Sequence, residues 1–276
     1  MSSNILFVFE GKNPERKIVQ SLEKNVLPPR RSIKCIYAED VYALYREIVA
    51  DEDLDIFTLL KTRNVENEQA LSGSYRNDFS EIYLFFDYDA HATMARRQTN
   101  EDGTITCGDA VIAEMLRFFD NETEHGKLYL SYPMVEALWH VLPDEQALVL
   151  TVRCKRDNCI DFSNCKKEKE CANDPHYKTR VGQECVPQLS NLNSYTRAIW
   201  CQLLDVHLKR LHYLVAGTMG IPTQLISQLS IFEKQLADFI SRSCPEVVVL
   251  SAFPVFVFDY FGAEATTRIF ELNNVT

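Results

Sequence analysis

The sequence predicts an α/β fold in which a mainly parallel sheet carries helices on both faces. Short apolar runs rich in β-branched and aromatic residues, at 4–9, 33–37 and 82–86, predict buried strands. The segments between these runs, after Pro14 and after Asp40, repeat apolar residues at helical spacing. Strands that alternate with helices in this way are typical of a doubly wound, Rossmann-like sheet, whose functional side chains lie at the carboxyl ends of the strands.

Capping residues place the helix starts. Asn13-Pro14-Glu15 predicts a helix with Asn13 as its cap and Pro14 at its first position. Asp40 is the predicted cap of the next helix, and residues 55–80 are expected to form a helix that ends in a loop. The later predictions are a helix at 109–119, strands at 127–132 and 148–152, helices at 195–215 and 223–241, and a buried strand at 247–260 before a helix-like tail.

Three regions follow from this pattern. Residues 1–152 carry the strand–helix alternation, whereas residues 153–190 replace apolar periodicity with charge, cysteine and asparagine and form a Cys-rich insert. Residues 191–276 form a helical C-terminal region with a terminal strand, which we expect to pack on the same core. Its helices are apolar on several faces, which favours burial between layers or, as an alternative, contact with a partner.

Charge and hydropathy narrow the functional classes. The chain of 276 residues has 39 acidic and 29 basic side chains, a formal net charge of −10. Because phosphate binding favours a basic surface, any nucleic-acid contact must be local, metal-assisted or helped by a partner. The first apolar run is too short for a signal peptide, and none is long enough to span a membrane, so we expect a cytoplasmic protein without membrane contact.

Acidic residues follow two of the predicted strands. Glu10-Gly11-Lys12 comes directly after the first, and Asp87-Tyr88-Asp89 after a later one. Three carboxylates that converge on one crevice repel one another unless a cation lies between them, and their hard oxygen atoms favour Mg²⁺ or Mn²⁺. A glutamate in such a site can also transfer protons. The alternative is that Glu10 is an acid at a helix start and the aspartates are loop acids.

These motifs resemble the TOPRIM family, over residues 1 to about 150. That family carries Glu-Gly after its first strand, as in Phe7-Val8-Phe9-Glu10-Gly11-Lys12, and Asp-x-Asp after a later one, as in Leu84-Phe85-Phe86-Asp87-Tyr88-Asp89. The resemblance implies a Mg²⁺-dependent nucleic-acid enzyme in which Glu10 transfers protons and binds metal together with Asp87 and Asp89. Tyr132-Pro133-Met134-Val135-Glu136 is similar to a segment of small TOPRIM effectors of bacterial anti-phage systems, PARIS-like or OLD-like. Glu136 and Lys12 are therefore additional candidates.

Other enzyme classes with similar acidic motifs are less favoured. The chain lacks the large DNA-gripping domains of topoisomerases and the zinc-binding start of primases, which disfavours strand passage and primer synthesis. HAD-type phosphatases also have an Asp-x-Asp motif, and His91 stands where their Thr or Val would be. Their motif normally opens the chain, so this alternative is less favoured, and His91 is kept only as a possible additional site residue.

Cysteines and basic residues supply weaker candidates. A cluster in the insert could bind structural Zn²⁺, although its spacings exceed those of common zinc modules, and the alternative is a loop of reduced thiols. Basic side chains near the acidic motifs could contact a phosphate backbone, or simply face solvent. The zinc candidates are Cys154, Cys159, Cys165, Cys171, His176 and Cys185, and the basic candidates are Arg16, Lys17, Arg96 and Arg97.

Together these observations predict a Mg²⁺-dependent nuclease that cleaves RNA, with transfer RNA as one candidate, or DNA. The resemblance implies a toxic effector of anti-phage defence that works with an ATPase. The chain has no Gly-x-x-x-x-Gly-Lys loop of its own, so ATP-driven control must come from another protein. Self-association is a second possibility. The competing hypothesis is a TOPRIM-fold binding or regulatory module that neither collects metal nor cleaves.

Overall fold

The computed structural model describes residues 4–29, 31–38, 40–51, 53–88, 98–99, 105–106, 108–143, 149–154, 176–264 and 266. The chain divides into two compact units. The first unit takes residues 1–86 and 114–129, and the second takes residues 87–113 and 130–276.

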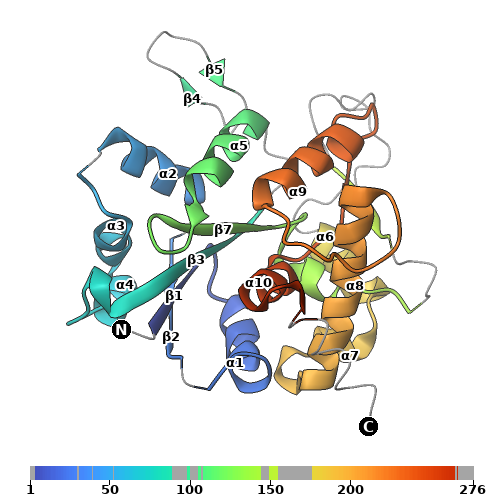
Figure 1. Cartoon of the computed structure of the whole chain (residues 1–276), viewed down its shortest axis with the longest axis horizontal. Coiled ribbons are helices and arrows are strands. Elements are labelled where there is room, and N and C mark those ends of the chain that lie inside the picture. The colour runs from blue at the N-terminus through green and yellow to red at the C-terminus, as the bar shows by residue number, and fades with distance from the viewer. Residues whose placement is uncertain are drawn as a thin grey trace. The chain divides into compact units, whose positions relative to one another are not determined.

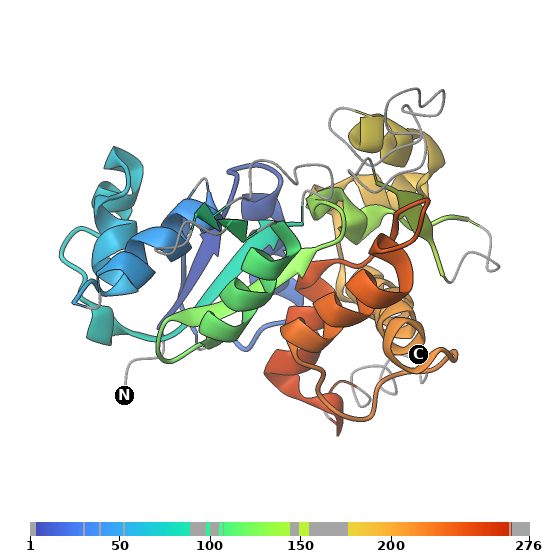
Figure 2. The same ribbon diagram turned by 90° about the horizontal axis from the view of Figure 1, so that it is seen from above.

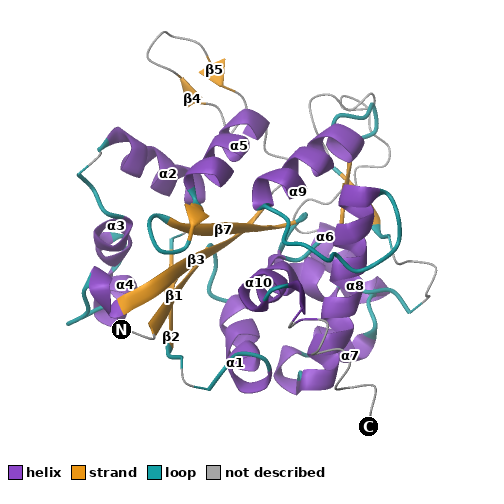
Figure 3. Cartoon of the chain, in the orientation of Figure 1, coloured by secondary structure: helices purple, strands orange, loops and turns teal. Residues whose placement is uncertain are grey.

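A five-stranded sheet forms the centre of the first unit (Figure 3). The strand order is β2-β1-β3-β7-β6, and β1 pairs in parallel with both β2 and β3, whereas β6 pairs antiparallel with β7. The mainly parallel α/β sheet that the sequence predicts is therefore confirmed. The strands are β1 (Asn4–Phe9), β2 (Ile33–Tyr37), β3 (Phe79–Asp87), β6 (Asp120–Asn121) and β7 (Gly126–Ser131).

Helices cover both faces of this sheet. Figures 1 and 2 show α1 on one face and α2 and α5 on the other. The rings of Tyr45 in α2 and Phe118 in α5 lie 5.5 Å apart, which joins these two helices on their shared face. The helices that accompany the sheet are α1 (Glu15–Asn25), α2 (Val41–Ala50), α3 (Ile56–Thr62), α4 (Val65–Ala70) and α5 (Gly108–Phe118).

The helix starts agree with the capping residues in one case and differ in another. Asp40 caps α2, because its side chain accepts hydrogen bonds from the backbone N–H groups of Tyr42 and Ala43. The prediction that Asn13 caps α1 is wrong by one residue. Pro14 occupies the cap position, and its carbonyl already accepts from the N–H of Ile18 at 3.2 Å.

Residues 55–80 form more elements than the sequence predicts. Two short helices, α3 and α4, are separated at Asn64, whose side chain accepts from the N–H of Asn67 and starts the second helix. A 3-10 turn at Arg76–Asp78 then leads into β3. An internal asparagine of this kind ends one helix because its carbonyl oxygen competes for backbone donors.

The second unit is mainly helical around a small antiparallel pair of strands, β8 (Thr151–Arg153) and β9 (Glu246–Val248). The helix α8 (Arg197–Ala216) lies against α9 (Gln228–Gln235) and α10 (Ala252–Phe261), and it buries Trp200 completely. The remaining elements are β4 (Gln98–Thr99), β5 (Ile105–Thr106), a 3-10 helix at Val135–Trp139, α6 (His176–Glu184), α7 (Pro187–Ser190), a 3-10 turn at Leu192–Ser194 and a π-helical turn at Leu236–Ile240.

The strand predicted at 247–260 is wrong beyond Val248. From Ala252 the chain is helical, and the side chain of Ser251 caps this helix by accepting from the N–H of Phe253. Pro254 is tolerated because it lies in the first turn, where the backbone N–H has no partner within the helix. All residues from Ala252 to Phe258 are buried, and a continuous apolar run does not distinguish a buried strand from a buried helix.

Part of the predicted insert is helical. Residues 155–175 lie outside the described residues, but 176–190 form α6 and α7. Tyr177, Val181 and Leu189 supply the buried side chains of this segment. Within the described residues, no helix has the length and apolar character needed to cross a membrane.

Side-chain amides occupy the outer backbone groups of two strands. Asn67 accepts from the N–H of Tyr37 at 3.1 Å and donates to its carbonyl at 2.7 Å, at the outer side of the edge strand β2. Gln235 makes the same pair with Val248 of β9, at 2.9 and 2.8 Å. Each amide thus replaces the neighbouring strand that a sheet edge lacks.

We expect the substitution Gln235→Met to destabilise the second unit. Gln235 is fully buried, so methionine would leave the N–H and C=O of Val248 without partners, at a cost of roughly 1–3 kcal/mol for each group. Both tryptophans, Trp139 and Trp200, belong to this unit, so their fluorescence during urea denaturation measures its free energy of unfolding.

The matched control is Lys234→Met, at the neighbouring exposed position, which should change the free energy of unfolding by less than about 0.5 kcal/mol. Equal stability of the Gln235→Met and Lys234→Met variants would show that the buried amide contributes nothing.

Candidate active site

Glu10 lies immediately after the buried strand β1. Residues Ile5 to Phe9 are fully buried, whereas Glu10 is partly exposed. Gly11 follows, and a Cβ atom at this position would lie 3.3 Å from Oε1 of Glu15, the first residue of α1. The absence of a side chain at Gly11 therefore lets a second, buried carboxylate approach the turn that carries Glu10.

Lys12 makes a surface ion pair at this turn. Its Nζ lies 2.7 Å from Oε2 of Glu66 and 5.9 Å from the ring centre of Tyr37. Both partners of the ion pair are more than half exposed, so the pair contributes little to stability. Lys12 is thus a cation on the surface beside Glu10.

The register of the sheet relates Glu10 to Asp87. Phe9 pairs with Phe85 across the parallel strands β1 and β3, and Asp87 is the last residue of β3. Glu10 therefore follows the carboxyl end of β1, and Asp87 ends its parallel neighbour β3. Asp87, like Glu10, is partly exposed.

Tyr88 anchors the chain directly after Asp87. Its ring is fully buried, its hydroxyl donates to Oδ1 of Asp109 at 3.0 Å, and its backbone N–H donates to the carbonyl of Ser131 at 3.0 Å. The ring also packs on Tyr132, with 5.3 Å between the ring centres. Tyr88 therefore has a packing role.

Asp87 and Glu136 act on the same tyrosine in the second unit. Glu136 lies buried in the 3-10 helix Val135–Trp139, with Oε1 3.9 Å from Nζ of Lys178. Burial raises the pKa of the neighbouring Tyr177 well above its usual value. Arg210 and, more weakly, Arg180 lower the pKa of Tyr177. Glu136 and, more weakly, Asp87 raise it further. Two of the predicted acids thus influence the pKa of one buried hydroxyl.

Tyr177 belongs to a buried polar cluster. Its hydroxyl lies 3.1 Å from Nδ1 of His140, whose Nε2 lies 3.4 Å from Oε2 of Glu184. Burial lowers the pKa of His140 to about 4, against the raising effect of Glu184, so His140 is neutral at pH 7 and this contact is a hydrogen bond rather than an ion pair. Arg180 binds the same carboxylate, with Nε 3.0 Å from both oxygens.

Arg210 contacts this cluster through the backbone of His140. It is fully buried and donates to the carbonyls of Val249 at 3.2 Å and His140 at 3.0 Å. Burial lowers its pKa to about 10, so the guanidinium remains charged at pH 7. This buried cation opposes the rise in the pKa of Tyr177 that burial causes.

Several predicted site residues lie outside the described residues. These are Asp89, His91, Arg96 and Arg97, together with Cys159, Cys165 and Cys171 of the proposed zinc cluster. His176 begins α6, but its side chain lies outside the described part as well. Cys154 and Cys185 are both buried. Among the described side chains, no group of three histidines, cysteines or carboxylates could hold a metal ion, and the zinc site stays a prediction.

Sequence reasoning missed Glu15, Tyr177 and Arg210. Glu15 stands at the predicted helix start, where an acid is favoured by the helix dipole, and this ordinary explanation hid its burial beside Gly11. Arg210 lies on a helix whose other buried positions are mostly apolar, and Tyr177 lies in a segment without clear periodicity. No local pattern marks either residue, because their partners come from distant parts of the chain.

The buried histidines predict a pH dependence of stability. Burial lowers the pKa of His207 to about 3, and its ring accepts from the N–H of Ser251 and contacts the carbonyl of Leu138, as a neutral imidazole does. Unfolded histidine titrates near pH 6.5. Below that pH the unfolded chain takes up protons that the folded chain does not, so the free energy of unfolding should fall by up to about 1.4 kcal/mol per pH unit for each histidine.

The variant His207→Gln keeps a donor and an acceptor but does not titrate, so it should reduce this dependence between pH 4.5 and 6. The contribution of neutral His207 to the free energy of unfolding is fully present above about pH 6.5. It is lost as the pH falls from there towards the lowered pKa of His207 in the folded protein. Urea denaturation followed by tryptophan fluorescence at a series of pH values measures it. His212→Gln, at a partly exposed position, is the control and should keep the wild-type dependence; identical curves for all three proteins would contradict the prediction.

Comparison of the chain with protein-family models, with curated proteins and with solved structures finds no match. The relationship to the TOPRIM family accordingly stays a prediction from the motifs around Glu10 and Asp87. What supports a function is the chemistry of these residues and their places at the ends of β1 and β3.

Proposed function

We propose that the chain is a metal-dependent nuclease of TOPRIM type, with Glu10, Asp87 and Asp89 as its central acids. The observation that carries this proposal is the pairing of β1 with β3. These strands are parallel neighbours, Glu10 directly follows one and Asp87 ends the other. Functional side chains of doubly wound sheets concentrate at this end of the strands.

The donor set fits a hard divalent cation. Glu10 and Asp87 offer carboxylate oxygens and are both partly exposed, so a hydrated ion can reach them. Asp89, the third acid of the motif, lies outside the described residues. A Mg²⁺ or Mn²⁺ ion held by Asp87 and Asp89, with Glu10 beside them, would supply positive charge that stabilises the phosphoryl oxygens during cleavage.

Other roles in the proposed reaction are proton transfer, phosphate contact and positioning of the backbone. Glu10 accepts a proton from the attacking water at a carboxylate oxygen, for which a partly exposed carboxylate beside the phosphate is suited. Lys12, exposed two positions later, contacts a phosphate of the substrate strand and thereby helps to position it. Tyr88, fixed by Asp109 and Ser131, keeps the backbone between the two aspartates in place.

Glu136 takes a supporting part in this proposal. Burial raises the pKa of Tyr177, Arg210 opposes this rise, and both Glu136 and Asp87 add to it. Glu136 therefore belongs to the same electrostatic surroundings as Asp87.

The net charge bears on substrate capture and control. An acidic chain of net charge −10 gains little from general attraction to a polyanion, so local cations such as Arg16 and Lys17 on α1 must hold the substrate. A partner that supplies further contacts would overcome the same difficulty. We therefore propose that the nuclease acts as an effector within a complex, with an ATPase as the controlling partner.

The first test is the variant Glu10→Gln. Loss of a residue that transfers a proton should lower the cleavage rate by at least about 100-fold. Cleavage is measured on transfer RNA, single-stranded RNA, single-stranded DNA and plasmid, with Mg²⁺ or Mn²⁺ and with excess chelator. Glu124→Gln, at an exposed position of the first unit, is the matched control and should cleave at the wild-type rate.

Each outcome of this test is decisive. Metal-dependent cleavage by the wild type that disappears in Glu10→Gln supports the proposal, provided that the variant unfolds at the wild-type urea concentration. Unchanged cleavage by Glu10→Gln refutes the assigned role. If the wild type cleaves none of these substrates and calorimetry detects no binding of Mg²⁺ or Mn²⁺, the chain is a binding or regulatory module instead.

A further inference from the structure

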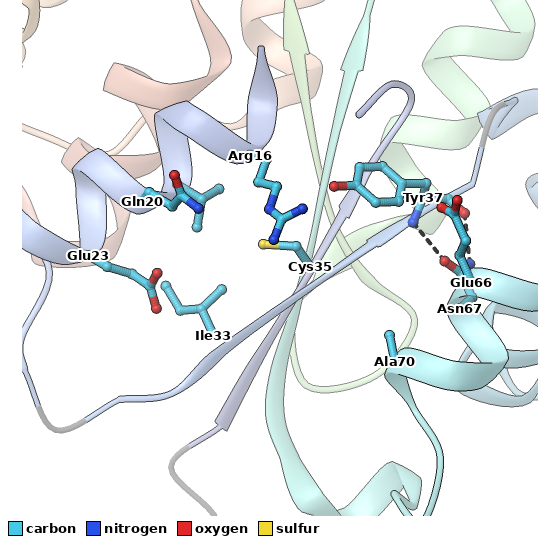
Figure 4. A pocket seen from close by; sticks show the side chains of 10 residues that line it. Arg16, Gln20, Glu23, Ile33, Cys35, Tyr37, Glu66, Asn67 and Ala70 are labelled. Carbon is cyan, nitrogen blue, oxygen red and sulfur yellow. Dashed lines mark hydrogen bonds between the residues drawn. The ribbon is translucent and has the colours of Figure 1, made fainter. Parts of the chain in front are cut away.

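A pocket of about 370 Å³ lies in the first unit and is lined by residues of α1, β2 and α4. Its floor is the edge strand β2, and its walls come from α1 and α4 (Figure 4). Lys12, whose Nζ lies 5.9 Å from the centre of the Tyr37 ring, connects the pocket with the Glu10 turn. The volume lies within the range of about 300–1,000 Å³ that is common for small-molecule sites.

The backbone of β2 presents one open hydrogen-bonding position to this pocket. The N–H of Ile5 donates to the carbonyl of Ser32, and the N–H of Ala38 donates to that of Phe9, so even-numbered residues of β2 face β1. The N–H and C=O groups of odd-numbered residues point outward, because backbone groups alternate along a strand. Asn67 occupies both groups of Tyr37.

Burial raises the pKa of Glu23, and the nearby backbone N–H of Ile33, the other neighbouring odd-numbered residue, opposes this rise. Among the described residues, no side chain takes the outward N–H and C=O of Cys35, which lies between Ile33 and Tyr37 on β2. Cys35 thus presents a donor and an acceptor with fixed directions at the floor of the pocket. An extended peptide would need a longer run of open positions to add a strand.

The side chains around this position are polar and largely uncommitted. Arg16 extends from α1 over Cys35 and faces the hydroxyl of Tyr37 (Figure 4). In the part of the chain that the structure describes, no hydrogen bond or ion pair engages Arg16 or the amide of Gln20. Burial raises the pKa of Cys35 to about 12, so its thiol remains protonated at neutral pH and adds no negative charge to the floor.

We propose that this pocket binds one unstacked nucleobase of the nucleic-acid strand, with Arg16 on an adjoining phosphate. The edge of a base offers the donor and acceptor that the open backbone position of Cys35 complements, and Gln20 can add a further amide hydrogen bond. This inference rests on the proposed nuclease function, because it names the part of the substrate strand that is held next to Glu10. It implies a preference for single-stranded or looped substrates, whose bases are free to leave the stack.

The test measures binding without cleavage. The full-length protein, in excess chelator, is titrated with AMP, GMP, CMP and UMP, with the corresponding nucleosides and with inorganic phosphate, by calorimetry. We expect at least one mononucleotide to bind, and Arg16→Gln to weaken its binding by about tenfold, the loss of one charge-assisted contact, while the matching nucleoside is affected less. Ala70→Phe, which fills the pocket from α4, should abolish binding of both.

Matched controls separate the pocket from general effects. Arg46→Gln removes an exposed arginine from α2, and Gln69→Phe adds an exposed ring to α4 next to the pocket residue; both should bind as the wild type does. The proposal is overturned if no nucleotide binds, if the pocket variants bind like their controls, or if inorganic phosphate binds as tightly as the nucleotides. Because cleavage is not the readout, nucleotide binding by a protein that cleaves nothing would leave the pocket assigned and refute only the nuclease.

Discussion

The parallel pairing of β1 with its two neighbours is the constraint on which the first unit depends. Residues Ile5 to Phe9 are fully buried, so every backbone N–H and C=O of this strand must find its partner in the sheet. Aromatic packing strengthens the same register, since the ring of Phe85 lies 5.0 Å from that of Phe7 and 5.5 Å from that of Phe9. A shift of one residue would move the end of β1 by about 3.3 Å relative to β3 and would separate Glu10 from the level of Asp87. The pocket on β2 depends on the same pairing, because the register decides which backbone groups of β2 point outward.

The sequence predicts those elements that have a local sequence pattern. The apolar runs at β1, β2 and β3, and the cap at Asp40, are such patterns, and the acids after β1 and β3 followed from them. The helix α10 was missed because burial on all sides removes the periodicity that distinguishes a helix from a strand.

The buried polar cluster could not be predicted from local sequence patterns, because its members are far apart in the sequence. Tyr177 meets His140 across 37 residues of sequence, and Arg210 reaches the carbonyl of His140 across 70. A buried arginine is costly unless its surroundings compensate the charge, and here the carbonyls of Val249 and His140 do so, although Nε has no hydrogen-bond partner among the described atoms. Such a group is tolerated only in one arrangement of its partners, so it specifies the packing of α8 against the segments that carry His140 and Val249.

The amide of Asn67 also protects part of the edge strand β2 from pairing with another chain. A second chain that approached β2 would find the backbone of Tyr37 already saturated, which blocks the strand-to-strand association that starts aggregation. This protection depends on a group that is chemically perishable, because asparagine side chains are thermolabile. Hydrolysis to aspartate would turn the donor that faces the Tyr37 carbonyl into another acceptor. The carbonyl of Tyr37 would thus lose the donor that Asn67 supplies.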